Sequence, residues 1–164
     1  MEQEENNSTS FALNARLPAF CMVQPTEGQG YMIVARDLLQ GVEALSTFQN
    51  ISPRSCAMIA AHALECTLKA FLSHTAPKVP HHHDIIALWN MAYKEKTLDI
   101  PKVPPDWVEV LASGHWPNFY IRYQEGQDGT VVHFGSTPAL IPMSVDLKKL
   151  FEKVELAIKG DHNQ

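Results

Sequence analysis

Apolar residues recur along most of this chain at the three- and four-residue steps of an amphipathic helix. The first such series predicts a helix over about residues 29–49. Its members are Tyr31, Val34, Leu38, Val42, Leu45 and Phe48. Prolines and glycines interrupt the preceding segment, so we expect residues 1–28 to be an irregular lead-in.

The second predicted helix is apolar on every side. Ser52-Pro53 provides an N-cap and a proline at the first helical position, and residues 54–74 contain neither Gly nor Pro. A helix without a polar face belongs in the middle of a bundle. Ala76-Pro77 ends it, because the residue before a proline disfavours helical geometry.

The rest of the chain predicts three more helices and one candidate β segment. The helices span about 82–96, 106–113 with Asp106 as its cap, and 144–159. Residues 119–123 and 130–134 flank Asp128-Gly129, which favours a short hairpin. We therefore expect one mainly α-helical domain over residues 29–160, with about five helices and at most one hairpin near 119–134.

Composition narrows the functional classes. The chain has 164 residues, 45% hydrophobic and 19% charged, as in an ordinary globular domain. No stretch approaches the roughly 18 uninterrupted apolar residues of a membrane span, and the acidic N-terminus does not resemble a secretory signal. We therefore expect a cytoplasmic protein without membrane contact. The net charge of −5 and the scattered basic residues disfavour nucleic-acid binding.

Helix 54–74 has one polar strip on its otherwise apolar surface. His62, Glu65 and Lys69 lie close together on the helical wheel, with Ser55 and Ser73 beside them. Glu65 and Lys69 form an i, i+4 pair in the favourable order. The strip is either a buried ion pair that fixes helix register or a binding pocket. In such a pocket Lys69 would bind an anionic ligand and His62 would donate or accept protons.

The run His81-His82-His83-Asp84 invites a metal-binding interpretation. Consecutive helical residues diverge by about 100°, so these side chains do not converge on one ion. The chain contains no Cys-x-x-Cys and no His-Glu-x-x-His. We therefore expect no native metal site and no cofactor, with only adventitious metal binding. Asp84 suits the N-terminus of the following helix, where its charge complements the dipole.

Three short motifs together resemble the HEPN superfamily (higher eukaryotes and prokaryotes nucleotide-binding domain). They are Glu65-Cys-Thr-Leu-Lys69-Ala70, His83-Asp-Ile-Ile-Ala-Leu88 and Tyr120-Ile-Arg122-Tyr123. The resemblance implies an all-α, up-and-down bundle, a homodimer and a nucleotidyltransferase partner. It also implies a candidate ligand site, for a nucleotide or other anion, formed by Glu65, Lys69, His83, Arg122 and Tyr123. If the last two lie on a strand, they point to opposite faces, and Arg122 is as well suited to a salt bridge with Glu65.

Many HEPN proteins are metal-independent ribonucleases with an Arg-x4–6-His motif, and this chain departs from that pattern. Seven residues separate Arg54 from His62, and ten separate Arg122 from His133. We therefore expect a non-catalytic HEPN-like binding or interaction domain that acts with a nucleotidyltransferase or toxin–antitoxin partner. The alternatives are a divergent ribonuclease, using Arg122 with His115 or His133, and a purely structural partner protein.

Overall fold

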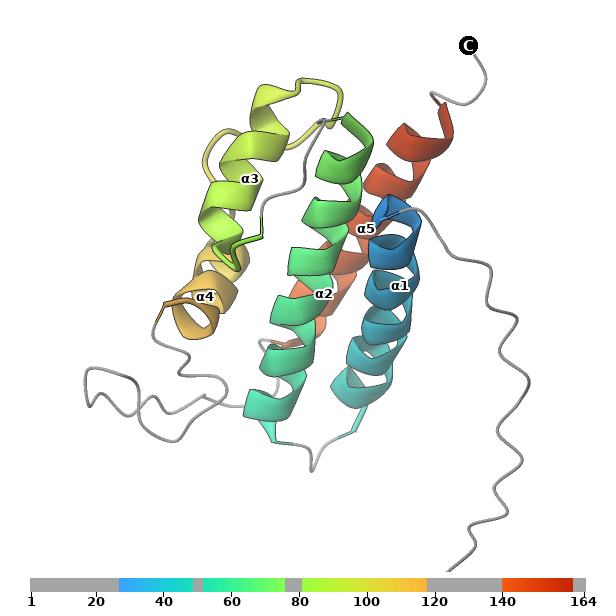
Figure 1. Cartoon of the computed structure of the whole chain (residues 1–164). Coiled ribbons are helices and arrows are strands. Elements are labelled where there is room, and N and C mark those ends of the chain that lie inside the picture. The colour runs from blue at the N-terminus through green and yellow to red at the C-terminus, as the bar shows by residue number, and fades with distance from the viewer. Residues whose placement is uncertain (1–26, 49–51, 76–80, 118–139, 161–164) are drawn as a thin grey trace, which may run out of the picture.

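Helix α2, Pro53–Thr75, contacts all four other helices of the structure. In the computed structural model α1 (Glu27–Ser46) and α5 (Leu140–Gly160) pack against each other and against α2 (Figure 1). Helices α3 (Ile85–Lys94) and α4 (Asp106–His115) likewise pack against each other and against α2. The structure describes residues 27–48, 52–75, 81–117 and 140–160. Within these ranges there are five helices and no strand, which confirms the predicted all-α bundle.

The central position of α2 follows from its sequence. Fourteen of its 23 residues are buried, and the buried positions surround the helix axis. Its start is as predicted, since the carbonyl oxygen of Ser52 accepts from the N–H of Ser55 at 3.0 Å. The helix is long and apolar enough to cross a membrane, but most of its apolar length is buried within the bundle.

The first helix, α1 (Glu27–Ser46), begins earlier than predicted and includes Gly28 and Gly30. A Cβ added at Gly28 would collide with the side-chain oxygen of Ser73 at the end of α2. The glycine therefore permits a close approach of two helices and does not mark a break in the chain. The apolar positions Ala35, Leu39 and Val42 then face the core.

The other helices also differ from their predicted bounds. Helix α3 is Ile85–Lys94, because Asp84 has extended backbone and caps the helix from outside. Helix α4 is Asp106–His115, and Pro105, not Asp106, occupies its N-cap position. Helix α5, Leu140–Gly160, starts before Ser144 because Pro142 is tolerated in a first turn. The predicted hairpin at 119–134 lies outside the described residues.

Asp84 provides a test of these helix starts. Its carboxylate accepts a hydrogen bond from the N–H of Ala87 at 2.9 Å, and loss of such a cap costs about 1 kcal/mol. We expect Asp84→Ala to lower the free energy of unfolding by that amount in urea titrations. Asp106→Ala is the matched control, because the Asp106 side chain does not cap α4, and an equal loss there would contradict the assignment.

Candidate functional site

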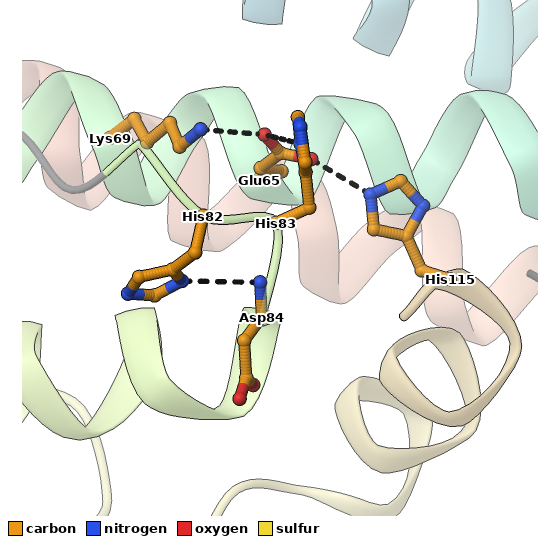
Figure 2. A network of polar contacts seen from close by, with 6 residues as sticks. All are labelled: Glu65, Lys69, His82, His83, Asp84 and His115. Carbon is orange, nitrogen blue, oxygen red and sulfur yellow. Dashed lines mark hydrogen bonds and ion pairs between the residues drawn. The ribbon is translucent and has the colours of Figure 1, made fainter. Parts of the chain in front are cut away.

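The carboxylate of Glu65 lies in the middle of the bundle, and its side chain is only 5% exposed. Its Oε1 atom is 2.8 Å from Lys69 Nζ and 2.9 Å from His83 Nδ1. Its Oε2 atom is 2.7 Å from His115 Nε2. Figure 2 shows these three side chains directed at the one carboxylate. We call Glu65, Lys69, His83 and His115 the Glu65 cluster.

The four residues reach the cluster from three separate parts of the chain. Lys69 lies one turn after Glu65 on α2. His83 directly precedes Asp84, whose N–H donates to His82 Nδ1 at 3.2 Å in the segment before α3 (Figure 2). His115 is the last residue of α4. The cluster therefore joins α2 to the start of α3 and to the end of α4.

The buried Glu65 carboxylate has both a countercharge and hydrogen-bond donors. The Lys69 ammonium compensates the Glu65 carboxylate, as a buried ion pair requires. His115 is 1% exposed, and its Nδ1 is buried and has no hydrogen-bond partner among the described residues. We assign the His115 proton to Nε2, where it is donated to Glu65, because a second proton on Nδ1 would be a buried donor without an acceptor.

The carboxylate keeps its charge despite its surroundings. Burial by itself raises the pKa of Glu65, but hydrogen bonds from His115, Lys69 and His83, with the Lys69 charge, lower that pKa to about 2. The Lys69 ammonium also lies 5.7 Å from the ring centroid of Tyr31, within range of a cation–π interaction. The neighbouring thiol is inert, since burial and the Glu65 charge raise the pKa of Cys66 to about 12.

The structure brings together three of the five predicted ligand residues, namely Glu65, Lys69 and His83. The other two, Arg122 and Tyr123, lie outside the described residues. His62 is exposed and is not part of the cluster. Because the Lys69 side chain is 4% exposed and ion-paired, the geometry favours the buried-pair interpretation of the strip over an open anion pocket.

Sequence reasoning did not assign His115 to this site. It considered His115 only as a partner of Arg122 in the ribonuclease alternative. Fifty positions separate His115 from Glu65, so no helical period or short motif links them. The one available signal was chemical: a buried ion pair needs further hydrogen-bond donors, and a histidine at a helix end can supply one.

Three members of the cluster could also hold a metal ion. Glu65, His83 and His115 offer ligand atoms that all lie within 4.8 Å of one another. The expectation that no metal site exists was based on consecutive helical histidines, but His81, His82 and His83 precede α3, and the three ligand atoms come from separate segments of the chain.

Comparisons with known proteins returned nothing for this chain. No protein-family model, no curated protein and no solved structure matches it. The interpretation of the site therefore depends on its own geometry and on the sequence motifs.

Removing the ammonium tests how much the buried pair contributes. In Lys69→Met the Glu65 carboxylate loses its compensating charge inside the bundle, and we expect a loss of roughly 3–5 kcal/mol in the free energy of unfolding. The matched control is Lys148→Met, because Lys148 pairs with Glu43 on the exposed surface. Chemical denaturation should show little change in the control. Equal effects of the two substitutions would contradict a special role for the buried pair.

The lowered pKa of Glu65 predicts a pH dependence of stability. A carboxyl with a folded pKa of about 2 and an ordinary value of 4.5 stabilises the fold above 4.5, and this contribution disappears as the pH falls towards 2. The shift corresponds to about 3 kcal/mol.

The test compares the free energy of unfolding of the metal-free wild type with that of Glu65→Gln. Glutamine is the control because its side chain resembles the protonated form of glutamate. We expect the difference in their free energies of unfolding to be constant above pH 4.5 and to shrink between 4.5 and about 2. A difference that is independent of pH over this window would show that the carboxylate charge does not stabilise the fold.

Proposed function

We propose that this chain is a non-catalytic binding and interaction domain of the HEPN type. The observation that supports the proposal most is the 2.9 Å contact between Glu65 Oε1 and His83 Nδ1. These residues belong to two of the three motifs on which the resemblance depends, Glu-x-x-Leu-Lys-Ala and His-Asp. The contact gives both motifs a common physical role, because each supplies part of one buried cluster.

The position of His115 argues against one form of the ribonuclease alternative, the pairing of Arg122 with His115, whereas the pairing of Arg122 with His133 lies outside the described residues. A general acid or base must reach the substrate, and His115 is buried with its Nε2 atom on Glu65. Arg54 and His62 are eight positions apart on α2, which separates them by about 12 Å along the axis. Neither the buried His115 nor the pair of Arg54 and His62 suits attack on an RNA phosphate, which needs an arginine and a histidine side by side.

The cluster also disfavours Lys69 as the group that receives an anion. A nucleotide phosphate would have to displace the Glu65 carboxylate and would leave that charge buried without compensation. We therefore propose that the domain acts through contacts with protein. The candidate partners are a second copy of the chain, a nucleotidyltransferase, or the other component of a toxin–antitoxin pair.

The test is to isolate the tagged chain from its native host and to measure the mass of the purified species. We expect a homodimer or a stoichiometric complex with a protein partner, no thermal stabilisation by a panel of nucleotides, and intact RNA after incubation. Arg122→Ala should behave like the wild type in the last two assays. Lys102→Ala, which removes an exposed positive charge elsewhere, is the control.

Three results would contradict the proposal. Stabilisation by a nucleotide that is lost in Arg122→Ala and kept in Lys102→Ala would show an anion-binding domain. RNA cleavage with the same dependence on Arg122 would show an enzyme. Isolation of the chain as a monomer without any bound protein would contradict the proposed protein contacts.

A further inference from the structure

We propose that the Glu65 cluster binds one divalent transition-metal ion of the zinc class, through the Glu65 carboxylate, His83 Nδ1 and His115 Nε2. The three ligand atoms lie within 4.8 Å of one another and come from α2, the segment before α3, and the end of α4. Two imidazoles and one carboxylate are a known donor set for zinc, and three protein ligands leave one position for water.

Two of the ligands are held in place and the third can move. Glu65 and His115 are buried, and the 2.7 Å contact between them orients both side chains. The side chain of His83 is 50% exposed, so it can adjust its position and gives the ion a route from solvent. Only small shifts are required, because ligands of a tetrahedral zinc ion with bonds of about 2.1 Å lie about 3.4 Å apart. The contacts of 2.9 and 2.7 Å from Glu65 to the two histidines would lengthen, and separations of up to 4.8 Å would shorten.

Metal binding requires a change of tautomer at both histidines but no net loss of protons. The protons now donated to Glu65, from His115 Nε2 and His83 Nδ1, would move to the other ring nitrogens. For His83 that nitrogen belongs to a half-exposed ring. For His115 it is Nδ1, which is buried and has no hydrogen-bond partner in the described part of the chain, so the proton there has no acceptor among those residues, and this cost lowers the affinity for the ion.

Lys69 has a defined place in the metal-bound arrangement. Its ammonium contacts Glu65 Oε1, whereas His115 contacts Oε2. An ion held by Oε2 and the two imidazoles leaves the contact between Lys69 and Oε1 intact. Lys69 then orients the ligating carboxylate, as hydrogen-bond partners of metal ligands commonly do. Its positive charge lowers the affinity of the site for a cation, which places the expected affinity below that of an all-anionic site.

The competing explanation for any metal bound by this chain is the run His81-His82-His83. Both His81 and His82 are exposed, and an exposed histidine run can bind metal adventitiously without the buried residues. The two explanations share His83 but differ in every other ligand. Variants at Glu65 and at His81 with His82 therefore separate them.

The experiment is a titration of the full chain, first stripped of metal with a chelator, with Zn²⁺ by calorimetry and with Co²⁺ by visible absorption. We expect one Zn²⁺ per chain and a four-coordinate Co²⁺ spectrum. His83→Ala and Glu65→Gln should each weaken binding by more than about tenfold. The double variant His81→Ala/His82→Ala should bind like the wild type.

Circular dichroism of each variant checks that it is folded. We expect His83→Ala to fold, because His83 is half-exposed and its loss leaves the Glu65–Lys69 pair intact. The binding test can therefore be read from this variant even if Glu65→Gln does not fold. The proposal is overturned by the absence of saturable binding to the wild type. It is also overturned by wild-type affinity in folded His83→Ala or Glu65→Gln. Loss of binding in His81→Ala/His82→Ala would identify an adventitious site on the exposed run.

Discussion

The arrangement of α2, α3 and α4 depends on one buried charge, the carboxylate of Glu65. Removal of a carboxylate from water is costly unless a countercharge and hydrogen bonds replace the solvent. Lys69 supplies the countercharge from the same helix, but the remaining donors, His83 and His115, come from elsewhere in the chain. The apolar residues of α3 and α4 bury against the core, and the carboxylate adds a second requirement, that the start of α3 and the end of α4 meet at Glu65.

Most of the fold could be predicted from the sequence, because helical period and burial are local properties. The absence of a polar face on α2 predicted its central position, which the structure confirms. The helix ends were less accurate, because tertiary contacts decide them. Two members of the first apolar series, Val34 and Phe48, are exposed, and Ala35 and Leu39 are buried in α1. Gly28 continues α1 because its missing side chain makes room for Ser73, and Asp84 stands outside α3 as its cap. Neither contact can be inferred from a residue type alone.

The site could be predicted only in part, for the same reason. The pairing of Glu65 with Lys69 follows from their spacing on one helix, and the structure has them 2.8 Å apart. His83 was included through the resemblance to HEPN proteins, not through a geometric argument. The assignment of His115 to the site required knowledge of how α4 packs against α2. Arg122 and Tyr123 stay predictions, because they lie outside the described residues.

The same carboxylate underlies both proposals, as the structural centre of an interaction domain and as a ligand for a divalent ion. Both require Glu65 to be charged within the bundle. The most direct test is a titration of the Glu65 side-chain carboxyl carbon by NMR in the metal-free protein. The account predicts a midpoint at about 2, held down by His115, Lys69 and His83 despite burial. A midpoint at or above the ordinary 4.5 would contradict it.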